Sequence, residues 1–349
     1  MSKKEKKFKT SHKVLIAVLS IVLFLLILVL IALLYINGKL DLMNQVDPTE
    51  ATMDQQQMQS YIDQNKETTE PDFTGEVINP EDIIWDEVDT SLVEGKDVIN
   101  ILLVGQDCRP GETRSRSDTM ILCSFNIEQK KFTMTSFMRD MYVQIPGWSS
   151  YKMNAAYAWG GMDLINKTIE KNFGIKIDGN FTVDFAAFES VIDELGGVTI
   201  DLTATEARYV GKWNYQDSNH FTEGPTLLNG ADALTYARAR SIGNADFDRT
   251  GRQRKVLTAI FESCKDLDIM ELLDLMDTVL PMLTTNMDNA TIMAYAWKIL
   301  PMASSINLDA SLRIPADGTY SFAWVDEMSV IMPNFSENRQ LLLETIYGE

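Results

Sequence analysis

The 349-residue sequence contains little histidine and little cysteine, and both shortages limit the chemistry that it can perform. Of its two histidines, only His220 lies beyond the N-terminal tail, which argues against a Ser-His-Asp hydrolase and a His-ligated zinc site. Its three cysteines, Cys108, Cys123 and Cys264, have the spacing of neither a disulfide framework nor a metal site. Any chemistry must therefore rely on carboxylates and arginines, with a hard metal ion as the candidate cofactor.

Arginine is missing from the first 108 residues, although the chain contains twelve. Nine of them fall in three short blocks, which are Arg109, Arg114 and Arg116; Arg139; and Arg238, Arg240, Arg249, Arg252 and Arg254. A guanidinium group forms forked hydrogen bonds to carboxylate or phosphate, whereas a lysine ammonium acts as a point charge. The blocks therefore indicate an anion-binding site, with an ion pair to a surface carboxylate as the alternative for any single arginine.

One long segment carries no charge at all, the 23 residues from Val14 to Ile36. As a helix it would span about 34 Å, enough to cross a bilayer, and it is too long for a signal peptide. Six lysines precede it, and residues 37–98 hold sixteen acidic residues against three lysines. We therefore expect a single-pass cell-membrane protein with a cytoplasmic tail at 1–13, a transmembrane helix at 14–36, an acidic extracellular stalk or linker at 37–96 and an extracellular domain at 97–349.

The expected domain alternates short apolar runs with amphipathic segments. Residues 99–105, 119–128 and 131–138 read as strands, the last two forming a hairpin. Residues 180–185 and 198–202 also read as strands, and residues 160–173 and 186–197 as helices. This alternation predicts an α/β fold, a three-layer α/β/α domain with a mixed central sheet.

Charged residues stand at the ends of the first three predicted strands. Asp107 follows the first strand, Arg116 and Asp118 precede the second, and Arg139 follows the third. If the first two strands are antiparallel neighbours, all four residues meet at one edge of the sheet. Mg²⁺, which prefers oxygen ligands, would relieve the repulsion between Asp107 and Asp118. In the alternative reading Asp118 caps a turn and Asp107 pairs with Arg109.

The remaining arginines fall in two predicted helices. In residues 228–240, Asn229 is a plausible N-cap, and Arg238 and Arg240 lie at the C-terminal end, where arginine also favours the helix dipole. In the next helix the apolar stripe, extended backwards by threes and fours, reaches Gln253, Arg252 and Arg249. Buried groups of this kind need partners, and a phosphate near the helix N-terminus would supply one.

The next two residues in that helix, Arg254 and Lys255, are off the stripe and predicted to face the surface.

Several blocks, in this order, resemble the LytR–CpsA–Psr family of bacterial envelope proteins. They are NILLVGQDCR, RSDTMIL, SFMRDMYVQIPG, KMNAAYAWGG, VDFAAFESVIDELGGV, LNGADALTYARAR and DFDRTGRQR, and they cover roughly residues 97–261. The resemblance implies an α/β domain with an apolar tunnel for a polyprenyl chain. It also implies an enzyme, a phosphotransferase that moves a phosphate-linked glycopolymer from a polyprenyl pyrophosphate carrier to peptidoglycan.

The resemblance also implies roles for individual residues. Asp107 and Asp118 match the magnesium ligands. The residues matching the pyrophosphate site are Arg116, Arg139, Arg238, Arg240, Arg249 and Gln253, and those implied in catalysis are Asp118, Arg116, Arg139 and Arg249. A sugar hydroxyl of the wall would attack the phosphorus nearest the glycopolymer, and polyprenyl phosphate would leave. The implied partners are the lipid-linked glycopolymer (teichoic acid, capsule or another glycan), peptidoglycan and the membrane.

Two other functions fit the same residues. A pyrophosphatase would use water as the acceptor in the same pocket. A non-catalytic regulator that binds the lipid carrier would need the arginines but would gain nothing from Asp107 and Asp118. Binding to nucleic acid is not expected, because the domain is predicted to lie outside the cell and the chain has a net charge of −19.

Overall fold

The computed structural model describes residues 30–47, 52–64, 75–90, 93–106, 117–305 and 311–348. The chain divides into two compact units, Met1–Leu42 and Met43–Glu349. In the first unit, residues 30–40 form a helix. Most of the predicted transmembrane helix at 14–36 lies outside the described residues, and no helix within them is both long and apolar enough to cross a membrane.

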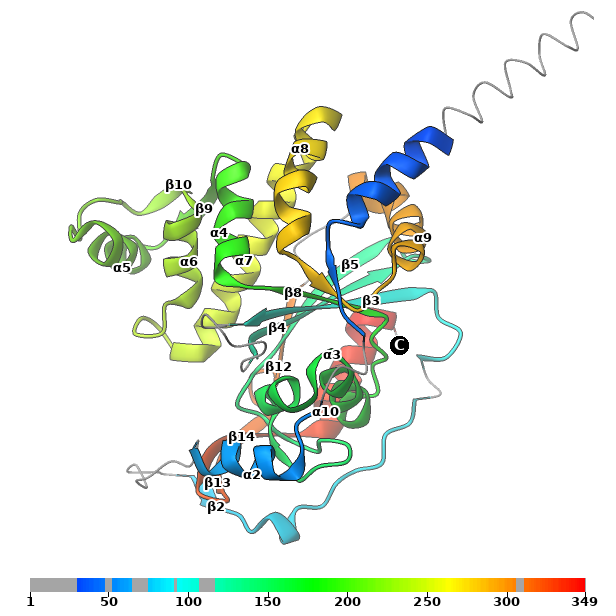
Figure 1. Ribbon diagram of the computed structural model, residues 1–349. Coiled ribbons are helices and arrows are strands. Elements are labelled where there is room, and N and C mark those ends of the chain that lie inside the picture. Colours follow the sequence, from blue (N-terminus) through cyan, green and yellow to red (C-terminus); the bar gives the residue numbers. More distant parts are fainter. Residues whose placement is uncertain are drawn as a thin grey trace, which may run out of the picture. The chain divides into compact units, whose positions relative to one another are not determined.

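A seven-stranded mixed sheet forms the centre of the second unit (Figure 1). Its strands, in spatial order, are β1 (Asn44–Gln45), β11 (Thr284–Thr285), β8 (Gly179–Val183), β3 (Val98–Gln106), β4 (Ser117–Asn126), β5 (Lys131–Phe137) and β12 (Ser311–Ile314). The pairs β3–β4 and β4–β5 are antiparallel, whereas β3–β8 and β5–β12 are parallel. The predicted α/β class with a mixed central sheet is confirmed, as is the hairpin of β4 and β5.

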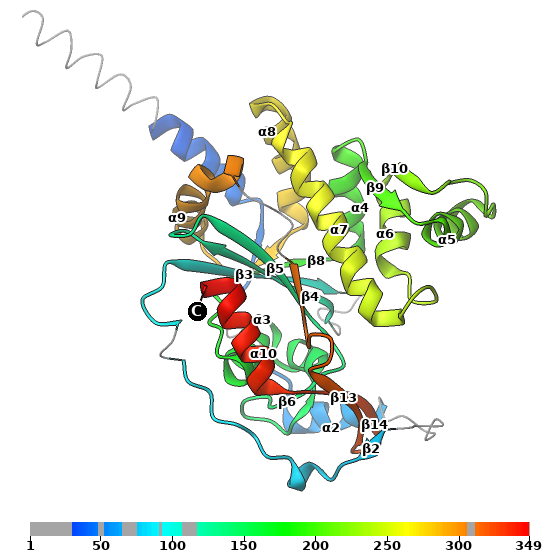
Figure 2. The same cartoon turned by 180° about the vertical axis from the view of Figure 1, so that it is seen from behind.

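Alternation along β4 explains why helices cover both faces of this sheet. Met120 and Leu122 belong to a core shared with α3 (Met153–Phe173) and α10 (Phe335–Leu342). Ile121 and Cys123 belong to a second core, packed against α7 (Ala245–Lys265). Figures 1 and 2 show α3 and α10 on one face of the sheet and α7, α8 (Ile269–Val279) and α9 (Asn289–Ile299) on the other.

The segment between β8 and α7 carries the helices that cover one end of the sheet. It contains α4 (Phe185–Glu194), β9 (Val198–Leu202), α5 (Ala204–Tyr215), β10 (Gly224–Leu228) and α6 (Gly230–Arg238). Asp184 caps α4 by accepting a hydrogen bond from the Ala187 N–H, and Asn229 caps α6 by accepting one from the Asp232 N–H. The predicted cap at Asn229 is therefore confirmed.

The helix α3 begins earlier than the predicted start at residue 160. It starts at Met153 and is interrupted at Gly160 and Gly161, where the backbone leaves the helical conformation. Gly161 has a φ of 62°, a value that glycine adopts without a steric penalty. The two glycines broke the amphipathic pattern of the sequence, so that only the second half of the helix was predicted.

Part of the predicted stalk at 37–96 belongs to the folded unit, which begins at Met43. β1 pairs with β11, and β2 (Glu76–Val77) pairs with β13 (Tyr320–Val325). Apolar side chains from this region pack against the main core, among them Met58 of α2 (Gln55–Gln64) and Trp85. Composition could not show that this segment joins the folded unit, because β1 and β2 pair with strands more than 200 residues away.

Short elements complete the described part of the chain. They are β6 (Tyr142–Val143), β7 (Tyr151–Lys152), β14 (Met328–Pro333), the 3-10 helices η1 (Pro80–Asp82), η3 (Leu280–Met282) and η4 (Leu300–Ser305), and the π-helical turn η5 (Leu343–Tyr347).

Candidate functional site

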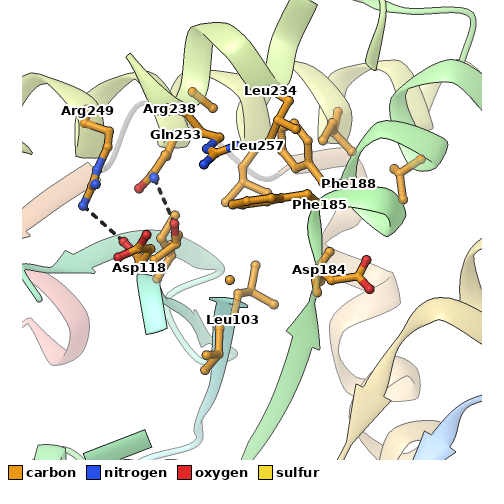
Figure 3. A pocket seen from close by; sticks show the side chains of 18 of the residues that line it. Leu103, Asp118, Asp184, Phe185, Phe188, Leu234, Arg238, Arg249, Gln253 and Leu257 are labelled. Atoms are coloured by element: carbon orange, nitrogen blue, oxygen red, sulfur yellow. Dashed lines mark hydrogen bonds between the residues drawn. The ribbon is translucent and has the colours of Figure 1, made fainter. Parts of the chain in front are cut away.

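A cavity of about 520 Å³ opens between the edge of the sheet and the helices α4, α6 and α7 (Figure 3). Its polar and apolar lining residues lie toward different ends of the cavity (Figure 3). Asp118, Arg238, Arg240, Arg249 and Gln253 form a polar end, and the apolar lining is Leu103, Val104, Ile121, Val183, Phe185, Phe188, Val191, Leu234, Ala237, Leu257 and Ile260. Such a cavity suits a ligand with an anionic head and an apolar tail.

α7 supplies residues to both parts of the cavity because its lining residues share one helical face. Arg249, Gln253, Leu257 and Ile260 recur at intervals of four, four and three residues. At 1.5 Å per residue, Ile260 lies about 16 Å along the helix from Arg249. The helix therefore runs from the cationic end of the cavity to its apolar wall.

Three guanidinium groups at the polar end share one carboxylate, Asp246, in the first turn of α7. Its oxygens lie 3.1 Å from Nη2 of Arg139, 3.1 Å from Nε of Arg240 and 3.2 Å from Nη1 of Arg249. Arg139 follows the end of β5 and Arg240 follows the end of α6, so Asp246 joins α7 to the segments after two other elements of the fold. This residue was not singled out from the sequence, although it lies in the DFDRTGRQR block.

Asp118, at the start of β4, is the second carboxylate of the network. Its Oδ1 accepts a 2.6 Å hydrogen bond from Arg139, and its Oδ2 lies 3.6 Å from Nη2 of Arg240. Its backbone carbonyl accepts a 3.2 Å hydrogen bond from Arg249. Burial by itself would raise the pKa of Asp118, but Arg139, Arg249 and Arg240 outweigh it and hold the pKa below its ordinary value. Asp118 is therefore ionised at neutral pH.

Arg249 is the most buried cation of the polar end, with 4% of its side chain exposed. Burial lowers its pKa to about 10, with repulsion from Arg139 and Arg240 and only partial compensation by Asp246 and Asp118. Within the described residues its Nε has no hydrogen-bond partner. A buried guanidinium with an unused donor beside other cations is suited to accept a multiply charged anion.

Gln253 and Arg238 complete the polar end. Gln253 donates a 2.8 Å hydrogen bond to the hydroxyl of Thr119, and the guanidinium of Arg238 lies 4.2 Å from the centre of the Phe185 ring (Figure 3). The structure thus brings Asp118, Arg139, Arg238, Arg240, Arg249 and Gln253 together at one end of the cavity or directly beside it.

Asp107 and Arg116, two of the predicted site residues, lie outside the described residues. Their neighbours in the chain, Gln106 and Ser117, are paired at the end of β3 and β4. Within the described ranges no cluster of three histidine, cysteine or acidic side chains could hold a metal ion. The magnesium site of Asp107 and Asp118 stays a prediction, which the ionised and partly exposed carboxylate of Asp118 fits.

Two arginines of α7 differ from the expected arrangement. Arg252, predicted to need a ligand, is buried against protein groups: it donates to the carbonyl of Ala239 and lies 3.9 Å from Glu206. Arg254, predicted to face the surface, is half-buried and donates a 2.6 Å hydrogen bond to the Ser136 hydroxyl. The surface prediction was wrong because β5 and β12 cover this side of the helix, which periodicity in one helix cannot reveal. Lys255 is exposed as expected.

Fold and site together define a mixed α/β protein with a cavity whose lining suits an amphiphilic anion. The chain belongs to the LytR_cpsA_psr family, whose model matches residues 49–334. It is 38% identical over 164 residues to the regulatory protein MsrR of Staphylococcus aureus (strain COL), covering 46% of this chain and 48% of MsrR. It is 37% identical over 190 residues to the polyisoprenyl-teichoic acid–peptidoglycan teichoic acid transferase TagT of Bacillus subtilis (strain 168), covering 53% of this chain and 59% of TagT.

The chain spans about half the length of the curated relatives it matches. Solved structures of TagT are similar over a larger part. A crystal structure of B. subtilis TagT has a TM-score of 0.57 and 28% identity, covering 75% of this chain and 94% of that one. A structure of TagT (YwtF) with bound octaprenyl pyrophosphate lipid has a TM-score of 0.51 and 25% identity, with the same coverage.

Proposed function

We propose that this protein transfers a phosphate-linked glycopolymer from a polyprenyl pyrophosphate carrier to peptidoglycan. The observation that carries the proposal is the cavity, in which a cationic end adjoins an apolar wall along a single helix. Support comes from the family, from the printed name of TagT and from the lipid in one TagT structure.

In this proposal the diphosphate lies among Arg139, Arg240 and Arg249, and the prenyl chain lies along the apolar wall. Forked guanidinium donors match phosphate oxygens, and their burial strengthens each contact. Phe188 and Leu257 offer the prenyl chain an apolar surface at the other end. Arg238, which lines the cavity, and Arg116 would add further positive charge.

The reaction would begin with attack by a sugar hydroxyl of peptidoglycan on the phosphorus nearest the glycopolymer. A phosphorus–oxygen bond forms to the acceptor, the bond to the bridging oxygen breaks, and polyprenyl phosphate leaves with that oxygen. The O–H bond of the acceptor breaks, and its proton passes to the leaving phosphate or to water. Arg139, Arg240 and Arg249 would offset the charge that develops on the phosphates. Asp107 and Asp118 would hold Mg²⁺, which when bound supplies further charge stabilisation to the leaving phosphate.

The proposed place of action is the outer face of a cell membrane of the Gram-positive type. It rests on the uncharged run at 14–36 and the lysine-rich tail before it. Protease treatment of protoplasts should remove the domain and leave a short membrane-bound stub, whereas a protected domain would contradict this topology.

The test of the proposed function uses the full-length protein in detergent, a carrier with radiolabelled polymer, Mg²⁺ and peptidoglycan. Label should appear on peptidoglycan in proportion to the polyprenyl monophosphate formed, and Arg249→Met should abolish both products. Label released as soluble polymer phosphate would instead indicate a pyrophosphatase. Carrier binding without either product would indicate a regulator, a role that the name of MsrR makes worth testing.

A further inference from the structure

Exposed large apolar side chains are concentrated in one stretch of the second unit, residues 269–300. This stretch holds half of all such side chains in the described part of that unit, and they are Ile269, Met270, Leu272, Met282, Trp297 and Leu300. Trp297 is 76% exposed, more than any other tryptophan in the described chain. Single exposed apolar residues are common on soluble proteins, whereas a concentration of them marks an interaction surface.

The stretch consists of α8, η3, β11 and α9, in that order along the chain. Both helices stand on the face of the sheet opposite α3 and α10, and β11 connects them (Figure 1). Ile269 and Leu272 are three residues apart, as are Trp297 and Leu300, so each pair lies on one side of its helix. We call these four residues, together with Met270, the α8–α9 surface.

The exposed residues of α8 belong to a capped helical turn. Asp268 accepts hydrogen bonds from the N–H groups of Met270 and Glu271, which satisfies donors that the helix itself cannot. Leu275, on the other side of the helix, is buried in the protein. The fold therefore fixes Ile269 and Met270 on the outside of a formed helix.

The chain itself brings a membrane close to this surface. The uncharged run predicted to cross the bilayer ends at Ile36, and Asn44 already pairs with Thr284 of β11. Residues 36–40 are helical and rise about 6 Å, and the four residues up to Asn44 add at most about 14 Å. β11 therefore lies within about 20 Å of the end of that run. α8, which is about 16 Å long, can cover most of this distance.

The composition of the α8–α9 surface suits the interface of a bilayer. Tryptophan is enriched at that interface, and isoleucine, leucine and methionine favour the acyl region beneath it. Residues 268–300 contain five acidic residues and one lysine, so attraction to anionic headgroups would not hold the surface there. The contact would be apolar. A weak contact suffices, because a membrane anchor in the same chain makes the binding intramolecular.

Both helices of the surface adjoin elements that form the apolar wall of the cavity. α8 packs against α4, which contributes Phe188 and Val191 to the wall. Ile292 of α9 belongs to the same apolar cluster as Leu103, another residue of the wall. A bilayer in contact with α8 and α9 would therefore lie next to elements that bind the prenyl chain in the proposed reaction.

We infer that the α8–α9 surface is a second membrane contact, which inserts its apolar side chains into the bilayer interface. The inference rests on the proposed function for the membrane anchor at 14–36, and it adds a lipid-binding site on the folded unit. This contact would keep the cavity beside the membrane that supplies the prenyl chain, so that the chain would cross little water on its way to the cavity.

The test measures quenching of tryptophan fluorescence by lipids with brominated acyl chains, in phosphatidylcholine vesicles that contain the full-length protein. The uncharged run has no tryptophan, so all six tryptophans of the chain report on the residues that follow it. The wild type should be quenched, and Trp297→Phe should lose this quenching. Trp213→Phe should keep it, and this variant is the matched control because Trp213 is 63% exposed but belongs to α5.

A further variant disturbs the contact and leaves every tryptophan in place. Met270→Glu should weaken the contact about tenfold, the scale of one large apolar side chain, and reduce the quenching accordingly. Its melting temperature in detergent should equal that of the wild type, because Met270 is exposed. Undiminished quenching in Met270→Glu would contradict a contact through the end of α8.

Four other results would overturn the inference. They are an unquenched wild type, quenching that persists in Trp297→Phe, quenching that disappears in Trp213→Phe, and quenching that requires anionic lipid. An unquenched protein that crosslinks to a second copy through Trp297 would assign the surface to a dimer instead. Normal polymer transfer without quenching would refute this inference alone, whereas quenching as expected without transfer would refute only the proposed function.

Discussion

Replacing Asp246 by asparagine should destabilise the unliganded protein and increase the stabilisation that a phosphate ligand provides. Asp246 holds Arg139, Arg240 and Arg249 together at 3.1 to 3.2 Å, and 19% of its side chain is exposed. Removing one partner of a fully buried ion pair costs ~3–5 kcal/mol. The partial exposure of Asp246 and the hydrogen-bonding amide reduce this cost, and we expect about 2 kcal/mol.

For a folded unit of this size, 2 kcal/mol corresponds to a fall in melting temperature of about 4 °C. Inorganic pyrophosphate at a hundred times its Kd should stabilise the wild type by about 2.7 kcal/mol and raise its melting temperature accordingly. At the same pyrophosphate concentration, the melting temperature of Asp246→Asn should rise further than that of the wild type, because this variant lacks a carboxylate that competes for the same guanidinium groups.

The assay is a thermal melt of the full-length protein in detergent, with and without pyrophosphate. Asp163→Asn is the matched control, since Asp163 forms an exposed ion pair with Lys167 on α3 and should change stability by no more than about 0.5 kcal/mol. If Asp246→Asn melts like this control, or if pyrophosphate stabilises it less than the wild type, Asp246 does not balance the arginine cluster.

Three further outcomes are expected. Asp118→Asn should fold normally but lose about 10²-fold in Mg²⁺-dependent transfer, measured with the labelled carrier, as for the loss of one preorganised charge contact. Leu234→Glu, in the apolar wall, should weaken binding of polyprenyl pyrophosphate by about tenfold or more and leave inorganic pyrophosphate unaffected, because only the prenyl chain meets the new charge. The folded protein lowers the pKa of Asp118 from its ordinary value of 3.8, so the stabilisation by the ionised carboxylate is present above pH 3.8 and is lost as the pH falls further. Melting curves of the wild type and of Asp118→Asn should therefore converge on acidification. A difference that persists in acid would contradict the ion pairs of Asp118.

The strands that build the site could be predicted because their signals are local. Residues 99–105 form a mainly apolar run, and β3 extends it by one residue at each end. The EQKK turn is short enough to fix β4 and β5 as an antiparallel hairpin, which the register confirms. Because strand ends carry the charged residues, placing the strands also placed Asp118 and Arg139 at one edge.

The contacts between distant segments could not be predicted in this way. Asp246 pairs with Arg139, 107 residues earlier in the chain, and nothing in its own helix distinguishes it from Asp248. The surface prediction for Arg254 failed for a related reason. Helical periodicity separates the faces of α7 but does not show which of them other elements cover. A helix covered on several sides has no single solvent face, and only the positions of α6, β5 and β12 reveal this.

The arginine cluster is already paired with carboxylates before any ligand arrives, and this has a consequence that can be measured. A diphosphate must compete with Asp118 for Arg139 and Arg240, so the ionised Asp118 lowers anion affinity as long as no cation neutralises it. Asp118→Asn should therefore bind pyrophosphate about two- to fivefold more tightly than the wild type when divalent cations are chelated, the scale of partly exposed ion pairs. The same variant should transfer less polymer, as argued above. A variant that loses both binding and transfer would show that Asp118 orients the arginines. Tighter binding with lost transfer would show that the charge of Asp118 opposes anion binding while the arginines keep their positions without it, as expected of a carboxylate that binds a metal ion.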